Sequence, residues 1–141
     1  MKIFLDTSSL FKLYHREADT SELELVFSTS KITDIFLSEI SKIEFTSTIW
    51  KKVRTHELTQ SQAHATLGMF ESDFTKYSFV ATGSIIIEQA RILCSKYGIE
   101  GLRTLESIQL STAVSLSQRV EQFLTADKLL KFLMQAEGLP T

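Results

Sequence analysis

The sequence predicts an α/β domain, a three-layer α/β/α sandwich in which helices cover both faces of a central parallel sheet. Short apolar runs typical of strands alternate with longer stretches of helical periodicity along the whole chain. This alternation favours parallel strands joined by right-handed helical crossovers. The 141 residues contain no linker or repeat, and the sole proline is Pro140, so we expect a single domain over residues 1–141.

The chain begins with a strand and two helices. Residues 2–5 form a short apolar run typical of a buried strand, and residues 7–15 are predicted to be the helix that follows it. Thr20 or Ser21 can cap a second helix, because both hydroxyls can accept a hydrogen bond from a free helix N–H group. Apolar side chains recur at helical spacing over residues 23–27, which supports this helix.

A second strand and two longer helices are predicted next. Residues 32–37 indicate the strand, and Ser38 is expected to cap a helix that ends near Thr55. The apolar side chains of that helix recur at helical spacing: Ile40, Ile43, Trp50 and Val53. Thr59 can cap a further helix that runs through Leu67 to Phe70.

The second half of the chain repeats the alternation. Ser84 is expected to begin a helix, and Gly98 stands where a left-handed residue would end it. Thr104 is predicted to open a buried helix to about Ser117, and Thr125 to cap the final helix. The two remaining strands are predicted over residues 77–81 and 120–124.

Composition excludes several classes of protein. Hydrophobic residues make up 43% and charged residues 23%, which excludes a disordered tail, a collagen-like chain and a disulfide scaffold. The net charge of -2 argues against a wholly basic nucleic-acid-binding surface but leaves room for a local basic patch. No apolar run is long enough for a membrane span or a secretory signal, and Cys94 is unpaired. We therefore expect a cytoplasmic protein without membrane contact.

Four carboxylates stand out by their positions. Asp6 and Asp127 directly follow predicted strands, and parallel sheets bind ligands at the carboxyl ends of their strands. Glu106 lies in the first turn of a helix that is apolar nearly all round, and Glu44 lies beside the apolar stripe of its own helix. Each acid alone could simply stabilise a helix N-terminus. Several inward-facing acids together need a cation, and carboxylate ligands without His or Cys favour Mg²⁺ or Mn²⁺.

These acids stand in four segments, in order along the chain: MKIFLDTSSLFKLY, LSEISKIEF, LRTLESIQLSTA and FLTADKLL. Together the segments resemble the signature segments of PIN-domain proteins, specifically the VapC-like toxins of bacterial toxin–antitoxin pairs. The resemblance covers nearly the whole chain. It implies a PIN-like α/β/α sandwich and a Mg²⁺- or Mn²⁺-dependent endoribonuclease. A cognate antitoxin and a homodimer are also family expectations, and covered apolar surface would fit the mean hydropathy of +0.05.

The resemblance also assigns roles to residues. By similarity, the acidic metal-binding and catalytic positions are Asp6, Glu44, Glu106 and Asp127, with supporting hydroxyls from Thr7 or Ser8 and from Thr125. The third acidic position is usually aspartate in this family and is Glu106 here. The longer side chain reaches further but is less well fixed, which puts the metal preference or the activity of this chain in question.

Basic residues near these acids are candidates for phosphate contacts. Lys51, Lys52 and Arg54 form a cluster at the end of the helix that carries Glu44, and Arg103 and Lys128 lie beside two of the other acids. Lysines at a helix C-terminus also simply favour the helix dipole.

Two other functions stay open from the sequence. A catalytically degenerate PIN module would bind RNA or a protein partner without cleavage, and the unusual Glu106 keeps that alternative. A haloacid-dehalogenase-like phosphatase would also place an aspartate after the first strand. That family needs a second acid two residues later, where this chain has Ser8.

Overall fold

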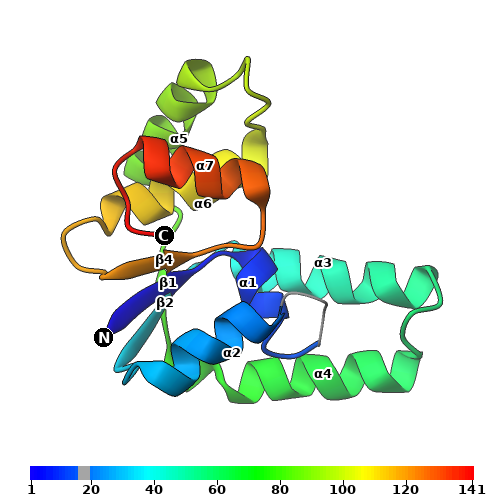
Figure 1. Ribbon diagram of the computed structural model, residues 1–141. Coiled ribbons are helices and arrows are strands. Elements are labelled where there is room, and N and C mark those ends of the chain that lie inside the picture. Colours follow the sequence, from blue (N-terminus) through cyan, green and yellow to red (C-terminus); the bar gives the residue numbers. More distant parts are fainter. Residues whose placement is uncertain (16–19) are drawn as a thin grey trace.

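Four strands and seven α-helices make up the described part of the chain, residues 1–15 and 20–141 of a computed structural model (Figure 1). The strands are β1 (Lys2–Leu5), β2 (Asp34–Ser38), β3 (Tyr77–Val80) and β4 (Gln122–Leu124). The first helices are α1 (Thr7–Phe11), α2 (Thr20–Thr29), α3 (Ser41–Arg54) and α4 (Gln60–Ser72). A 3₁₀ turn, η1 (Phe74–Lys76), precedes β3, and α5 (Ser84–Lys96), α6 (Thr104–Ser115) and α7 (Lys128–Ala136) complete the chain.

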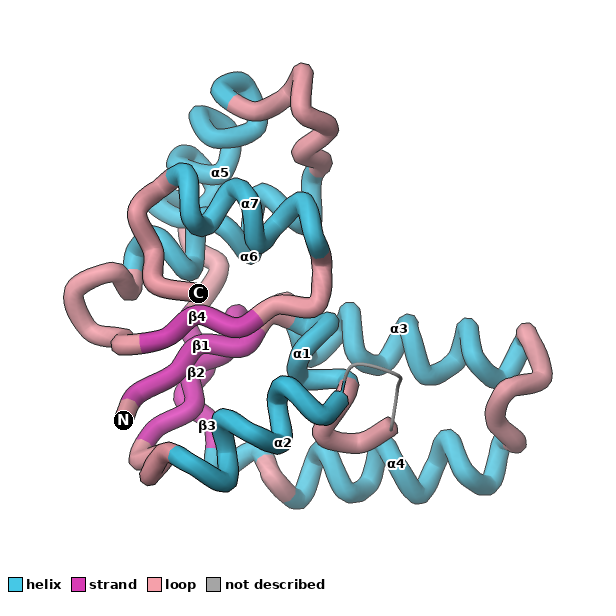
Figure 2. The backbone as a smooth tube through the Cα atoms, viewed as in Figure 1, coloured by secondary structure: helices cyan, strands magenta, loops and turns pink. Residues whose placement is uncertain are grey.

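The sheet has the strand order β3-β2-β1-β4, and all its strand pairs are parallel. In the register of the sheet, Phe4 of β1 lies opposite Phe36 of β2 and Phe123 of β4. The tube view shows β1 inside the sheet, between β2 and β4 (Figure 2). Because the strands are parallel, the residues that follow β1 and β4 meet at one edge of the sheet.

Helices cover both faces of the sheet, which confirms the predicted three-layer α/β/α sandwich. Successive side chains of β1 alternate between two cores: Phe4 packs into one, and Ile3 and Leu5 into the other. The Phe4 core is completed mainly by α5, α6 and α7. The opposite core is completed by α1, α2, α3 and α4, and the α3–α4 pair projects beyond the sheet (Figure 1).

The helix that carries Glu44 begins later than predicted. Ser38 is the last residue of β2 rather than a cap, and α3 begins at Ser41, with Ile40 as an N-cap that makes no side-chain hydrogen bond. The strand pairing extends past Ser38, because the Glu39 amide donates to the carbonyl of Val80 in β3 (2.9 Å).

The apolar stripe of α3 is shifted from the predicted one. Ile43 is 73% exposed, whereas Phe45 and Ile49 are fully buried. The predicted cap of α4 is confirmed, because Thr59 and Gln62 form a reciprocal capping box. The predicted end of α3 near Thr55 is also confirmed.

Three other local predictions were wrong, and one lies outside the described side chains. The first helix ends at Phe11, four residues before the predicted end. Gly98 has no positive φ; Gly101 takes that conformation instead (φ 101°), three residues further into the turn. The cap of α7 is Asp127 rather than Thr125. Capping of α2 by Thr20 or Ser21 concerns side chains that are not described.

Candidate active site

The candidate site begins at the carboxyl ends of β1 and β4. The Asp6 amide donates to the Leu124 carbonyl (3.2 Å), which extends the pairing of β1 and β4 by one step. Asp6 then begins α1, and Asp127 begins α7. Parallel pairing thus places two carboxylates from opposite ends of the chain beside each other, as the sequence predicted.

Asp6 is the most enclosed of the four acids, with 3% of its surface exposed. Its carboxylate accepts hydrogen bonds from the Ser9 amide (2.9 Å), the Ser8 hydroxyl (2.8 Å) and the Thr125 hydroxyl (2.6 Å). Burial raises the pKa of Asp6 to about 6, although these three hydrogen bonds lower it in part. The negative charge of Asp127 also raises this pKa.

The hydroxyls of Ser8 and Thr125 connect the two turns. Ser8 Oγ accepts a hydrogen bond from the Ala126 amide (2.9 Å), and Thr125 Oγ1 accepts one from the Asp127 amide (3.0 Å). Each hydroxyl therefore contacts the Asp6 carboxylate on one side and the β4–α7 turn on the other. Both were predicted as supporting hydroxyls, and the structure places both against Asp6.

Glu44 is held by a separate group of polar side chains. Its Oε1 atom accepts hydrogen bonds from the Thr7 hydroxyl (2.8 Å) and from Nε2 of Gln109 (2.8 Å). Ser41, one turn earlier on α3, lies 2.9 Å from the Thr7 hydroxyl. Thr7 thus supports Glu44, while its neighbour Ser8 supports Asp6.

The sequence analysis missed Gln109 as a site residue. It lies on α6 and is only 3% exposed. One signal could have found it: a glutamine on a helix predicted to be buried needs hydrogen-bond partners inside the protein. Its position three residues after Glu106 places it on nearly the same helix face as that acid.

Glu106 lies at the start of α6 and is less enclosed than Asp6. About one third of its side chain is exposed (34%), and Arg103 lies 3.8 Å from its carboxylate. The structure therefore places a cation beside the acid whose identity departs from the usual family pattern.

All four predicted acids line one cavity of about 480 Å³. Thr7, Ser8, Arg103 and Gln109 are also part of its lining. A second cavity, of about 540 Å³, shares Thr7, Ser8, Glu44 and Asp127 with the first and adds Lys12 and Lys52. The acids thus border two hollows that share one wall.

The acids suit a hard cation bound partly through water. Within the described ranges, no three His, Cys, Asp or Glu side chains lie close enough together to hold a metal ion directly. Mg²⁺ keeps several of its waters and is usually bound through one or two carboxylates. The carboxylates are all oxygen ligands, and burial together with Asp127 disfavours the charge of Asp6, which a cation would relieve. These features fit a hydrated Mg²⁺ or Mn²⁺.

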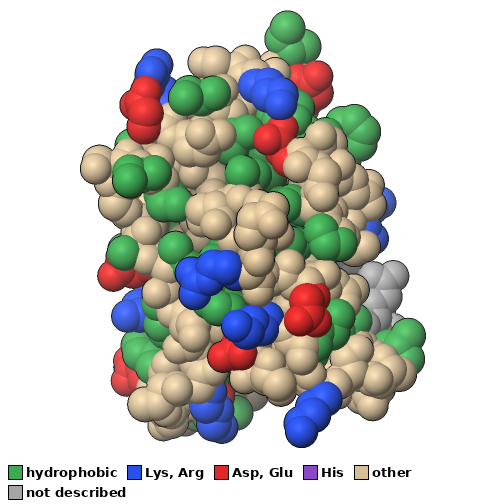
Figure 3. Space-filling view, turned by 90° about the vertical axis from the view of Figure 1, so that its left-hand side faces the viewer, with side chains coloured by type: hydrophobic (Ala, Val, Ile, Leu, Met, Phe, Trp, Pro, Cys, Tyr) green, Lys and Arg blue, Asp and Glu red, His purple; other side chains and the backbone are tan. Residues whose placement is uncertain are grey.

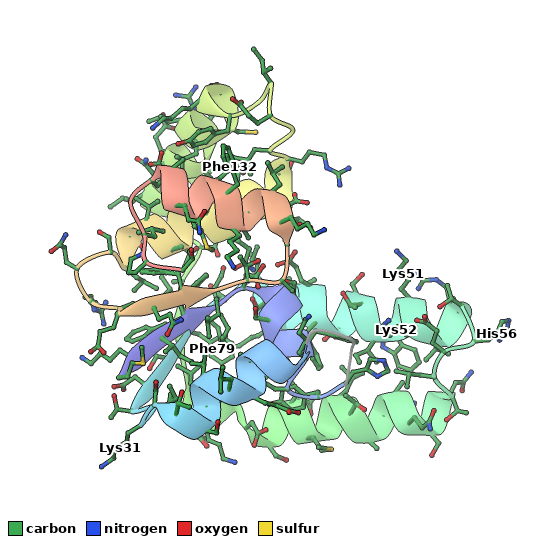
Figure 4. All side chains as sticks on the ribbon, in the orientation of Figure 1. Lys31, Lys51, Lys52, His56, Phe79 and Phe132 are labelled. Atoms are coloured by element: carbon green, nitrogen blue, oxygen red, sulfur yellow. The ribbon has the colours of Figure 1, made fainter. Side chains whose placement is uncertain are left out.

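The basic residues predicted to contact phosphates lie in different parts of the surface and do not form one cluster. Lys52 lines the second cavity, where its ammonium group pairs with Glu57 (2.9 Å), and Arg103 lines the first. Lys51 lies on another side of α3 from Lys52, near the tip of the α3–α4 pair (Figure 4). Arg54 and Lys128 are exposed and line neither cavity.

The face of the molecule that carries the N-terminus has no large patch of one charge sign. The face at the left of Figure 1, where the N-terminus lies, mixes acidic, basic and hydrophobic side chains (Figure 3). This mixture agrees with the net charge of -2. In the described part of the chain, no helix is both long and apolar enough to cross a membrane.

The sheet order, the helices on both faces and the acids at the strand ends define a PIN-like fold. Solved structures that share it include the following three. One is VapC20 of Mycobacterium tuberculosis, described as a toxin that cleaves the sarcin–ricin loop; it is 14% identical, with a TM-score of 0.70, and the match covers 93% of this chain and 94% of that one.

The other two structures are toxin–antitoxin assemblies. VapBC2 of Rickettsia felis, bound to a DNA fragment from its promoter, is 18% identical, with a TM-score of 0.62 and coverage of 94% of this chain and 92% of that one. A toxin–antitoxin complex of Klebsiella pneumoniae is 16% identical, with a TM-score of 0.63 and coverage of 89% and 86%. No protein-family model and no curated protein matches the sequence. These likenesses establish the fold, and the resemblance noted in the sequence predicted it.

Proposed function

We propose that this chain is a Mg²⁺- or Mn²⁺-dependent endoribonuclease that acts as the toxin of a toxin–antitoxin pair. The observation that carries the proposal is the meeting of four carboxylates from four elements, Asp6, Glu44, Glu106 and Asp127, around one cavity. The fold supports it, because a solved structure with this fold is described as a toxin that cleaves the sarcin–ricin loop.

The side chains divide the chemistry between them. The four acids would hold the metal ion, directly or through water, and the bound ion would polarise the phosphate and lower the pKa of an attacking water. Ser8 and Thr125 orient the Asp6 carboxylate by donating hydrogen bonds to it. Arg103 and Lys52 face the two hollows and supply positive charge for the phosphates of the RNA.

The test is cleavage of a labelled structured RNA by the purified chain with Mg²⁺ or Mn²⁺ and with EDTA. We expect cleavage only with the metal, and none by Asp6→Asn, which keeps the shape of the side chain but removes its charge. Undiminished cleavage in EDTA, or by Asp6→Asn, would show that the acids are not a metal-nuclease site.

A second candidate is a module that binds RNA or a protein without cutting. The Arg103–Glu106 pair favours this candidate, because a cation already lies beside one of the acids. The spacing of the acids favours it too, because no three acidic, His or Cys side chains among the described residues lie close enough together to bind a metal directly. In the same assay, RNA binding without cleavage at any metal concentration would establish this alternative.

We further propose a cytoplasmic homodimer with a cognate antitoxin. Several large apolar side chains on α5 and at the start of α6 are exposed: Ile85, Ile87, Ile92 and Leu105. Association would cover them, and two solved structures with this fold are toxin–antitoxin assemblies. Light scattering of the purified chain measures the dimer, and a monomer at all concentrations would contradict it.

A further inference from the structure

Gln109 connects the two helical layers at the candidate site. Its Nε2 atom lies 2.8 Å from Oε1 of Glu44, 3.0 Å from the Thr7 hydroxyl and 3.1 Å from the Ser41 hydroxyl. Thr7 and Glu44 belong to α1 and α3 on one side of the sheet, whereas Gln109 belongs to α6 on the other. The side chain also lines the acid cavity.

The Glu44 carboxylate sets the direction of the hydrogen bonds in this group. Thr7 donates to Glu44, so the Thr7–Ser41 contact requires Ser41 to donate to Thr7. One N–H group of Gln109 donates to Glu44, and the other faces the hydroxyl oxygens of Thr7 and Ser41. If the amide were turned over, its carbonyl oxygen would face an ionised carboxylate. The amide is therefore oriented by the charge of Glu44.

Gln109 also has a buried polar atom that destabilises the folded protein. Its Oε1 atom is buried, and it has no hydrogen-bond partner in the described part of the chain. An unpaired buried carbonyl is unfavourable, and a leucine of similar size would avoid that cost. A glutamine at this position is thus better explained by what its N–H groups hold than by the packing of α6.

We propose that Gln109 is a positioning residue, which fixes the Glu44 carboxylate at the wall of the acid cavity in the orientation that binds the hydrated metal ion. This inference rests on the proposed metal-dependent function and adds to it a residue that acts through Glu44. Partners that orient a metal-binding side chain in this way contribute about 10- to 100-fold to metal affinity.

The test measures Mn²⁺ binding by calorimetry, without RNA, on the full chain. We expect Gln109→Leu to bind Mn²⁺ about 10- to 100-fold more weakly than the wild type. The matched control is Thr112→Val, which removes a buried hydrogen-bonding hydroxyl from the same helix but lines neither cavity. The control should keep wild-type Mn²⁺ affinity, whatever its melting temperature.

A double-mutant comparison separates positioning from a merely structural role. In a Glu44→Gln background, Gln109→Leu should cause no further loss of Mn²⁺ affinity, because Gln109 acts through the Glu44 carboxylate. Wild-type affinity in Gln109→Leu, or an equal loss in both backgrounds, overturns the inference while leaving the metal-dependent function intact. Absence of Mn²⁺ binding by the wild type overturns both. If Gln109→Leu does not fold, the unbranched Gln109→Met takes its place.

Discussion

Asp6 serves both the fold and the candidate site. Its carboxylate caps α1 through the Ser9 amide, and the same carboxylate lines the acid cavity with a pKa raised to about 6. The cap stabilises the helix, whereas the buried charge destabilises the metal-free protein. The two effects can be separated, because asparagine caps a helix about as well as aspartate does but carries no charge.

The first prediction concerns the pH dependence of the free energy of unfolding without metal. Between pH 3.8 and about 6, Asp6 is protonated in a larger fraction of the folded protein than of the unfolded protein. The stability of the metal-free protein should therefore fall by roughly 3 kcal/mol as pH rises through this window, and stay low at neutral pH. Denaturant unfolding in EDTA from about pH 4 to about pH 7 measures it.

Asp6→Asn provides the control for this prediction. The variant should lose most of the pH dependence in that window and melt higher than the wild type at neutral pH in EDTA. Mn²⁺ should raise the melting temperature of the wild type and help the variant less, because it binds only the folded site. A variant that melts lower in EDTA, together with no response to Mn²⁺, would contradict a shared acidic site.

A second prediction separates the roles of Glu106. Its carboxylate lines the acid cavity beside Arg103, so Glu106→Gln should lower RNA cleavage about tenfold or more. Glu106→Asp should keep or raise activity, because it restores the usual family residue. Initial cleavage rates at a fixed Mn²⁺ concentration measure both variants. If the glutamine variant cleaves like the wild type, Glu106 only stabilises the start of α6.

Sequence reasoning found the acids and their hydroxyl partners but missed the amide between the layers. Asp6 and Asp127 could be predicted because strand ends of a parallel sheet meet at one edge. Gln109 could not be placed in the same way, because its contacts with Thr7 and Glu44 depend on how α6 packs across the sheet. Periodicity along one helix carries no information about the helix opposite.

At the scale of elements, cap chemistry predicts a helix start correctly only where tertiary structure does not override it. The Thr59 cap of α4 follows from local chemistry alone, and it is confirmed. Ser38 is equally suited to a cap by its chemistry, but pairing with β3 extends past it and keeps it in the strand. Capping preference is a local property, whereas the length of a strand depends on its neighbours.

A third prediction compares two glycines. A Cβ atom at Gly98 would lie 2.9 Å from the Cys94 carbonyl, so Gly98→Ala should destabilise the end of α5 by about 1 kcal/mol or more. Gly68, inside α4, has open space at the same position, and Gly68→Ala should stabilise the protein by about 0.5–1 kcal/mol. Denaturant unfolding of both variants measures the difference, and equal effects would contradict the close approach at Gly98.

At the scale of the whole molecule, the basic residues predict how RNA binding depends on salt. Replacing Lys51, Lys52 and Arg54 together by alanine should weaken binding and make its salt dependence shallower. Because only Lys52 of the three lines a cavity beside the acids, Lys52→Ala alone should reduce the salt slope by about 1. Affinities of a catalytically inactive Asp6→Asn background, measured over a series of salt concentrations, provide the slope.

Lys31 offers the matched control, because it is exposed and lies far from α3 in Figure 4. Lys31→Ala should leave the slope unchanged. If Lys52→Ala also leaves the salt slope of RNA binding unchanged, Lys52 does not contact RNA phosphates and has only a structural role, in its pair with Glu57.

The overall architecture followed from the alternation of short apolar runs and helical stretches, and the structure confirms it. The projection of the α3–α4 pair beyond the sheet could not be predicted, because it depends on packing between helices rather than on their periodicity. Lys51 and Lys52, adjacent in sequence, lie in different surroundings because successive residues of a helix point to different sides (Figure 4).

The candidate site draws on both layers, because Asp6 and Glu44 lie on the side of one core while Glu106 and Gln109 lie on α6, in the other. A partly folded chain with only one layer in place would therefore lack part of the lining of the acid cavity. The site therefore forms only when both helical layers have packed on the sheet. Under the proposed function, incompletely folded copies of the protein would leave RNA intact, and RNA cleavage would report complete folding.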